Sequence, residues 1–219
     1  MHCSCDPSGF PLIAVAESGL EVHLLPVTKV QFERFLAEPN AFGDTWYEQI
    51  LPGNPRIPPH GLTTENREGL FLSGVLPGEA LAFARWLGED YDLPPVQEWR
   101  AAYAALQGAP LYLPPLLSQC PARPVGPILE GLVAQLCPSS LLDLSLMRGG
   151  LVEWVRQDSG WAGLGSPRPA FQPNLWDPLA ETVRPIRPGE RVPYFGFRLV
   201  RRTTKIIERP DHRPLTADR

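Results

Sequence analysis

The sequence predicts a single α+β domain that is rich in loops, with short antiparallel strands and about three helices. Three observations lead to this fold class. A chain of 219 residues is long enough to bury one substantial core. Its 27 prolines and 19 glycines interrupt regular structure, because proline breaks helices and central strands. Apolar residues follow strand periodicity in short runs and helical periodicity in a few longer ones.

The N-terminal part begins with a predicted hairpin within residues 10–27, where two short apolar runs are joined by a turn-forming Glu-Ser-Gly string. A helix is expected at about 29–37. Thr28 and Gln31 fit a capping box at its start, since each side chain can satisfy a backbone N–H of the other residue. Residues 38–75, rich in Pro, Gly, Asn and Thr, are expected to be mostly irregular.

Two further helices are predicted in the middle of the chain. One begins near Pro77, because proline suits the first turn of a helix, and ends before Gly88, a favourable C-cap. The other spans about 95–106 and closes at Gly108.

The C-terminal half is expected to contain strands and loops. Short apolar runs indicate strands near 151–156 and 194–201. Residues 160–193 contain seven prolines and show no sustained periodicity. Polar residues at the end of the chain are expected to fray. We therefore expect a domain over residues 1–202 and a polar tail over 203–219.

Composition and charge exclude several classes of protein. Hydrophobic residues make up 43% and charged residues 20% of the chain, as in soluble globular proteins. The net charge is −4 and no basic stripe is interleaved with aromatics, so nucleic acid is not an expected partner. No apolar run reaches the roughly 18 residues that span a bilayer, and no signal peptide is seen. We therefore expect a cytoplasmic location or association with a virion or phage. Arginine largely replaces lysine and the loops are rich in proline, so we expect a thermostable protein; a GC-rich genome is the alternative explanation of this bias.

The four cysteines are interpreted as thiols. Cys3 and Cys5 form a C-x-C pair, which is one half of a possible metal site. A zinc site would need two further ligands, and only the distant Cys120 and Cys137 are available. We therefore expect a terminal pair of free thiols and two small buried residues rather than a metal site.

Several strings along the chain, in this order, resemble the formylglycine-generating (sulfatase-modifying-factor) family: residues 26–36, 75–87, 93–103, 148–155 and 194–200. The strongest match is 93–103, which retains the leucine, proline, glutamate, tryptophan and alanines of the family string. The resemblance covers most of the chain and implies a C-type-lectin-like fold.

Five residues of these strings are expected to serve as scaffold: Glu98, Trp99, Glu153, Trp154 and Arg198. Adjacent helical residues point about 100° apart, so Trp99 can enter the core while Glu98 reaches a partner such as Arg198. A buried guanidinium needs carboxylate or carbonyl partners.

The family's catalytic residues have no counterpart here. Members that make formylglycine bind copper with a cysteine pair in the C-terminal third, and thiolates suit cuprous copper. In this chain the last cysteine is Cys137. Related enzymes bind iron with histidines of an additional helical bundle, and the four histidines here are scattered. At the positions of the family's calcium-binding asparagines and aspartate this chain has about Ser140, Gly150 and Leu146, so oxygen ligands that calcium needs are lost. We therefore expect no catalytic residue, no metal and no cofactor.

Two weaker signals lie nearby. Residues 148–150 are expected to form a tight turn, and an anion site made by their backbone N–H groups is the alternative. Asp158 and Asp177 are expected to be solvated loop carboxylates, and a role as acids is the alternative.

Residues 160–195 form the candidate binding region, because C-type-lectin folds bind ligands through loops between their late strands. Aromatic and arginine side chains are enriched at binding hot spots. The candidate contact residues are Trp161, Arg168, Phe171, Gln172, Asn174, Trp176, Asp177, Glu181, Arg184, Arg187, Arg191 and Tyr194. Alternatively, Trp161, Phe171 and Trp176 form a satellite core under a long loop.

The region also resembles the variable proteins of diversity-generating retroelements, since residues 164–166 and 196–198 bracket it as such proteins bracket their hypervariable stretch. We expect a non-catalytic protein that binds an unknown protein or surface ligand. The alternatives are a divergent oxidoreductase of the family and a degenerate accessory domain whose partner supplies the activity.

Overall fold

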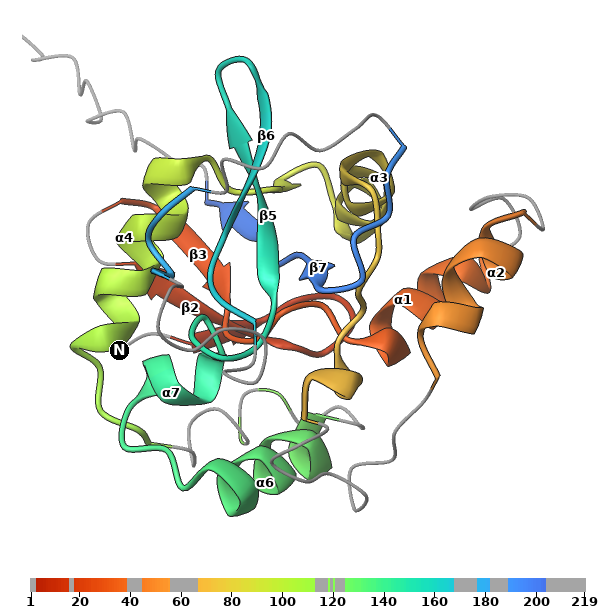
Figure 1. Cartoon of the computed structure of the whole chain (residues 1–219). Coiled ribbons are helices and arrows are strands. Elements are labelled where there is room, and N and C mark those ends of the chain that lie inside the picture. Colours follow the sequence, from red (N-terminus) through yellow and green to blue (C-terminus); the bar gives the residue numbers. More distant parts are fainter. Residues whose placement is uncertain are drawn as a thin grey trace, which may run out of the picture.

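The structure is a computed structural model of the chain, and it describes residues 3–15, 18–38, 45–55, 67–112, 118, 120, 125–167, 177–181 and 189–203. It is a mixed α and β structure in which two sheets are surrounded by helices (Figure 1). Of the predicted tail only Thr203 is described. None of the described helices is long and apolar enough to cross a membrane.

The larger sheet is fully antiparallel and has the strand order β1-β2-β3-β8-β4. In the smaller sheet, ordered β6-β5-β7, β5 pairs antiparallel with β6 and parallel with β7. The strands are β1 (Cys3–Cys5), β2 (Pro11–Val15), β3 (Leu20–His23), β4 (Tyr91–Asp92), β5 (Val152–Gln157), β6 (Gly160–Leu164), β7 (Phe195–Gly196) and β8 (Val200–Arg202).

The predicted hairpin and C-terminal strands are confirmed, with one refinement. β2 and β3 pair as the hairpin, and β5 matches the strand expected near 151–156. The strand expected at 194–201 is divided, because β7 joins the smaller sheet and β8 joins the larger one. Between them, residues 197–199 cross from one sheet to the other and are completely buried.

Six α-helices occur among the described residues. They are α1 (Lys29–Leu36), α2 (Thr45–Ile50), α3 (Pro77–Leu87), α4 (Val96–Gln107), α6 (Val125–Leu136) and α7 (Leu141–Ser145), with 3₁₀ helices at Leu51–Gly53 and Arg67–Leu70. α1, α3 and α4 are the three predicted helices. The capping box is also confirmed: the Gln31 N–H donates to Thr28 Oγ1 (3.3 Å) and the Thr28 N–H donates to Gln31 Oε1 (2.9 Å).

The expected number of about three helices is too low. α6 escapes prediction because Pro127 lies in its first turn, where a missing N–H breaks no helical hydrogen bond. α7 is only five residues long, too short to show a periodicity, although Ser140 caps it by accepting from the Asp143 N–H (3.2 Å). α2 and the two 3₁₀ helices lie in the stretch 38–75 that was expected to be irregular.

Two hydrophobic clusters hold these elements together. One lies between the larger sheet and helices α4, α6 and α7, and it includes Trp99 and Leu129. The other is rich in aromatic rings and joins α1 and α3 to the crossing segment. In it Phe32 stacks on Phe83 at 5.6 Å, and Phe197 meets Phe83 edge-on at 5.8 Å.

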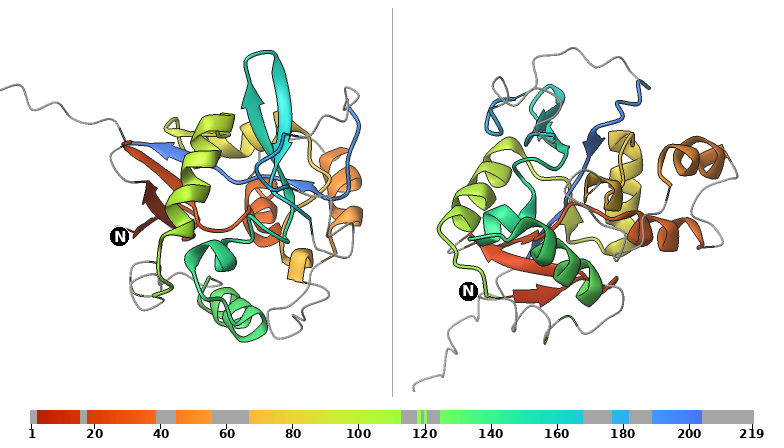
Figure 2. Two further views of the ribbon diagram at one scale, coloured as in Figure 1. Left: turned by 60° about the vertical axis from the view of Figure 1, so that its left-hand side comes forward. Right: turned by 60° about the horizontal axis from the view of Figure 1, so that its bottom comes forward.

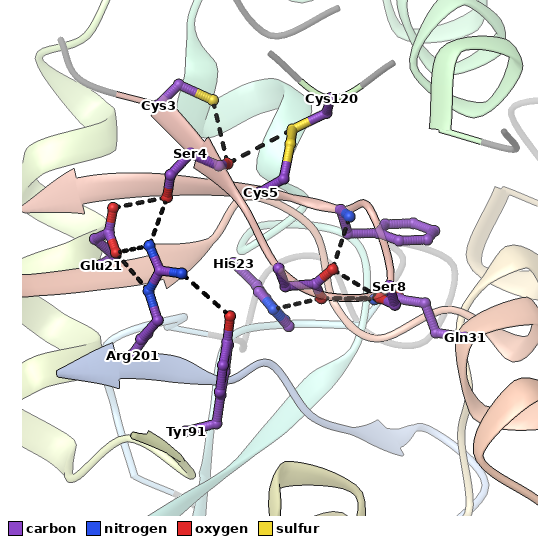
Figure 3. The surroundings of a disulfide bond; sticks show 12 residues. Cys3, Ser4, Cys5, Ser8, Glu21, His23, Gln31, Tyr91, Cys120 and Arg201 are labelled. Atoms are coloured by element: carbon purple, nitrogen blue, oxygen red, sulfur yellow. Dashed lines mark hydrogen bonds and ion pairs between the residues drawn. A yellow bond between two sulfur atoms is a disulfide. The ribbon is translucent and has the colours of Figure 1, made fainter. Parts of the chain in front are cut away.

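The cysteines differ from expectation. Cys5, at the end of edge strand β1, forms a disulfide with Cys120, and their Cα atoms are 5.7 Å apart (Figure 3). Cys3 is a buried free thiol, whereas Cys137 is an exposed one. The prediction of two free terminal thiols is therefore wrong for Cys5, and the prediction of burial is wrong for Cys137. The disulfide joins positions that only the tertiary fold brings together.

A partly buried polar cluster lies beside the disulfide (Figure 3). Arg201 Nε donates to Glu21 Oε2 (2.7 Å), and its Nη2 donates to Ser4 Oγ (2.9 Å). Its Nη1 donates to the Tyr91 hydroxyl (3.4 Å). Burial raises the pKa of Tyr91 to about 12, and the nearby Arg201 guanidinium only partly opposes this effect. These contacts tie β1 to β3, β4 and β8.

Asp6, in the turn between β1 and β2, is also buried. Its carboxylate accepts from the Phe10 N–H (2.8 Å) and from Ser8 Oγ (2.8 Å). His23 Nε2 lies 3.0 Å from Oδ2 but outside the alignment of a good hydrogen bond. Burial alone would raise the pKa of Asp6. The contact with His23, the charge of His23 and the N–H and hydroxyl donors have the larger combined effect, and they lower the pKa below its ordinary value.

Candidate binding site

One buried network joins three of the strings identified in the sequence. Trp99 on α4, Glu153 on β5 and Arg198 in the crossing segment are all completely buried. Arg198 makes a bidentate ion pair with Glu153, with Nε–Oε2 at 2.6 Å and Nη2–Oε1 at 2.7 Å. Trp99 Nε1 donates to Glu153 Oε2 at 2.8 Å.

The remaining donors of the Arg198 guanidinium are also used. Nη1 donates to the carbonyls of His23 (3.0 Å) and Leu24 (2.9 Å), and Nη2 donates to the Ser145 carbonyl (2.9 Å). A guanidinium has five N–H groups, so each finds an acceptor. Because a buried charge is tolerated only when it is paired and hydrogen-bonded, this network fixes α4, β5, α7 and the end of β3 relative to one another.

Glu98 does not contact Arg198, so the predicted pairing is wrong. Its Oε2 accepts from Arg202 Nη2 at 2.8 Å. The physical reason is the helix: Glu98 points about 100° away from the buried Trp99 and reaches the end of β8 rather than the interior. Trp154 is buried, and its Nε1 donates to the Val75 carbonyl at 2.8 Å.

A cleft of about 630 Å³ opens between the start of α4 and the tip of the β5–β6 hairpin. Figure 1 and the left view of Figure 2 show this hairpin projecting from the body of the molecule. The lining residues are Pro95, Val96, Gln97, Arg100, Arg156, Gln157, Asp158, Ser159 and Glu181.

Local structure explains how the cleft forms. The Arg156 N–H donates to the Pro94 carbonyl at 2.9 Å, which attaches the hairpin to the start of α4. In the hairpin Arg156 pairs with Trp161 and Gln157 pairs with Gly160, so residues 158–159 form the turn. Gly160 has a φ of 147°, a conformation that favours glycine.

Charges in the cleft are partly compensated. Arg100 lies 3.2 Å from Glu181, and Gln157 also donates to the Glu181 carboxylate. Arg156 lies 2.8 Å from Asp92 outside the cleft. Within the described part of the chain, the Asp158 carboxylate and the Gln97 amide show no hydrogen-bond partner, so both can meet a ligand.

Of the predicted contact residues, Glu181 lines the cleft, and Trp161 and Asp177 belong to the hairpin and the short segment that carry lining residues. Trp161 is 37% exposed and lies across the hairpin from Arg156. Asp177 and Glu181 begin and end the short described segment beside it. Asp158, a candidate acid in the sequence, lines the cleft as an exposed carboxylate.

Arg191 lies elsewhere and is fully engaged. It pairs with Glu79 on α3 (2.6 and 2.8 Å) and donates to the Gly74 carbonyl (3.0 Å) and to Gln49 (3.0 Å). It therefore connects α2 to α3 beside a smaller cavity of about 160 Å³. Tyr194 packs on Phe195, with ring centroids 5.5 Å apart, at the edge of the aromatic cluster.

The other predicted contact residues lie outside the described residues. They are Arg168, Phe171, Gln172, Asn174, Trp176, Arg184 and Arg187. Of the three residues of the alternative satellite core, Trp161 is described, whereas Phe171 and Trp176 also lie outside the described residues.

Sequence reasoning missed Gln97 and Arg100, because the string that contains them was assigned to scaffold. The signal was present: positions 97 and 100 are three apart and polar, so they share a helix face turned away from Trp99. The turn interpretation of residues 148–150 is supported, since Gly149 has a φ of 74° and its N–H donates to Ser166 Oγ (3.0 Å). The Gly150 N–H donates to the Ser166 carbonyl (3.0 Å), so neither amide is available to an anion.

Comparison with known proteins gives no further assignment: no protein family and no curated protein matches the sequence. Among the residues that the structure describes, no three histidine, cysteine, aspartate or glutamate side chains converge as a metal site would require. Function is therefore inferred from the geometry of the cleft and its surroundings.

Proposed function

We propose that this chain is a non-catalytic binding protein on a C-type-lectin-like scaffold. Its binding face comprises the nine residues that line the cleft together with the neighbouring Trp161 and Leu179. The observation that carries the proposal is this polar cleft, formed beside a projecting hairpin and flanked by two exposed hydrophobic side chains.

The scaffold part of the proposal is supported by the buried network. Trp99, Glu153 and Arg198 come from three different family-like strings, and Glu153 bonds directly to both of the others. A chance likeness of short strings would give no reason for their distinctive side chains to meet. The pairing of β8 with β3 also brings the first and last parts of the domain together in one sheet.

The binding part is supported by the size and composition of the face. A volume of about 630 Å³ falls within the range of ligand pockets, about 300–1,000 Å³. Trp161 and Leu179 are 37% and 38% exposed, and aromatic and arginine side chains are typical of binding hot spots. The face is mounted on α4 and β5, two elements anchored in the core, which suits a preorganised binding surface.

The non-catalytic part rests on the sequence. In the family that the sequence resembles, catalysis requires a cysteine pair in the C-terminal third, and no cysteine follows Cys137. Turnover of a cysteine peptide in the presence of copper or iron would contradict a non-catalytic function.

If the chain is a retroelement variable protein, residues 160–195 would differ between copies of the gene while the buried network stayed constant.

Site-specific photo-crosslinking tests the binding face. A photoreactive phenylalanine analogue replaces Trp161 in one variant and Tyr112, beyond the other end of α4 and 65% exposed, in a control variant. With cells of the source organism or particles recovered from them, we expect one discrete adduct from position 161 and none from position 112. Equal adducts from both positions, or none from position 161, would contradict a binding role for this face.

Sequencing of codons 160–198 across a population of the source organism tests the retroelement assignment. Substitutions confined to that window, with a near-copy template and a reverse transcriptase nearby, are the expected result. An invariant window without a template would leave a binding protein with a fixed ligand.

A further inference from the structure

Glu181, which lines the cleft, is the last residue of a short segment, residues 177–181, which we call the strap. Figure 1 shows it between α4 and the β5–β6 hairpin. It contains two of the predicted contact residues, Asp177 and Glu181. Its backbone forms no ladder with a strand, so other contacts must fix its position.

One end of the strap is fixed to the hairpin. The Gly165 N–H, just after β6, donates to the Pro178 carbonyl at 2.8 Å. The strap is also folded on itself, since the Leu179 N–H donates to Asp177 Oδ1 (2.9 Å) and the Ala180 N–H donates to the Asp177 carbonyl (3.1 Å). These bonds define a compact Asx turn.

The other end is fixed by Arg100 of α4. Its Nη2 donates to the Leu179 carbonyl (2.9 Å) and to Glu181 Oε1 (3.2 Å). Gln157 of β5 donates to the second oxygen of the same carboxylate. A guanidinium can serve a carbonyl and a carboxylate at once, whereas a lysine ammonium cannot reproduce that planar fork.

We propose that Arg100 is the positioning residue of the binding face. It holds the strap against α4, and this sets the width of the cleft and the place of Asp177 and Glu181. The inference rests on the proposed function, because it assigns to α4 the task of presenting a wall of the binding site. Side chains of the strap then determine ligand specificity. The position of the strap is determined by α4, a helix outside the candidate region 160–195.

Hydrogen–deuterium exchange of the full chain tests this anchor in the absence of any ligand. In Arg100→Gln we expect the amides of Leu179 and Ala180 to exchange about tenfold faster, the combined scale of one exposed ion pair and one hydrogen bond. Arg100→Lys should give an intermediate rate. Amides of the β5–β6 ladder in the same sample should keep their rates, which shows that the variant is folded.

Arg148→Gln is the matched control, since Arg148 forms an exposed pair with Asp143 (2.8 Å) that does not involve the strap. It should leave exchange in the strap unchanged. Glu181→Gln should accelerate exchange, and the double variant should show less than the sum of the two single effects, because both substitutions remove the Arg100–Glu181 ion pair. Exchange in Arg100→Gln that is no faster than in the control, or fully additive effects, would overturn the proposal.

These outcomes are separable from those of the crosslinking experiment. A specific adduct at position 161 with unaltered exchange in Arg100→Gln would retain the binding face and reject the anchor. Accelerated exchange without an adduct would retain the anchor and reject the binding face.

Discussion

Arg198 shows how much of this fold depends on a single buried charge. Its guanidinium bonds to side chain and carbonyl groups from β5, α7 and the segment after β3. Taking such a charge out of water is unfavourable, and only a complete set of partners offsets that cost. The arrangement therefore tolerates the loss of one partner poorly.

We expect Arg198→Met to lower the free energy of unfolding by about 3–5 kcal/mol, because Glu153 is left as an unpaired buried carboxylate. Equilibrium unfolding in urea measures the change. Arg148→Met, in an exposed pair, should cost less than about 1 kcal/mol. Adding Glu153→Leu to Arg198→Met should recover part of the loss, and equal costs for the two arginine variants would refute this account.

Asp6 predicts a stability change at acidic pH. Its folded pKa lies below the ordinary value, so its contribution to stability is fully present above the unfolded pKa, about 3.9. That contribution is lost as the pH falls from there through the lower folded pKa. Thermal melts between pH 5 and pH 2 should show a steeper loss in the wild type than in Asp6→Asn, and parallel curves would argue against the assignment.

At the scale of elements, the crossing segment begins at a tightly packed point of the fold. It enters at β7, where the backbone of Gly196 lies against a neighbouring carbonyl. A Cβ added there would lie 2.7 Å from the Leu72 carbonyl oxygen and 2.5 Å from Leu151 Cδ1. The oxygen belongs to the backbone, so it cannot turn away as a side chain would.

We expect Gly196→Ala to destabilise the protein by about 1–3 kcal/mol through overpacking. The matched control is Gly78→Ala in the first turn of α3, where the added Cβ meets no atom within 4 Å. That variant should be neutral or more stable by up to about 1 kcal/mol, because alanine favours helix. Melting temperatures of the two variants against wild type test the pair, and similar shifts would contradict it.

Elements with a strong local signal could be predicted from the sequence. The capping box at Thr28 and the proline at the start of α3 each predict a helix from residues within one turn, and the alternating apolar runs predict the hairpin. α6 does not follow from the sequence, because a high proline content indicates interrupted helices, whereas Pro127 lies in the first turn, where a helix accepts proline.

The candidate site could be predicted only in part, because a cleft is a property of tertiary structure. Trp161 and Glu181 come from the region that composition singled out. Arg100 comes from a helix about 80 residues earlier, and no local pattern links it to the strap. The partner predicted for Glu98 is wrong for the same reason, because only the tertiary position of β8 decides whether Arg198 or Arg202 reaches this carboxylate.

At the scale of the whole molecule, the Cys5–Cys120 disulfide closes a loop with a sequence separation of 115. It ties the edge strand β1 to the chain ahead of α6. Loops of that length restrict the unfolded chain strongly, so a large share of the stability should depend on this bond.

We expect the double variant Cys5→Ser/Cys120→Ser to lose about 4–5 kcal/mol of unfolding free energy. Unfolding in urea without reductant measures the loss. Cys137→Ser changes an exposed free thiol, so this variant should unfold like the wild type both without reductant and in its presence. An unchanged midpoint in the double variant would show that the bond contributes little.

The place of β8 has a consequence for biosynthesis. It is the last described strand along the chain, yet it lies between β3 and β4 in the sheet. Until it has left the ribosome, the hairpin and β4 keep open edges, and Glu153 has no counter-ion. A message cut short before codon 198 would therefore give a product without β8, the interior strand that joins β3 to β4. If the gene does vary between codons 160 and 198, only copies read in frame to Arg198 would mature, so folding itself would reject frameshifted variants.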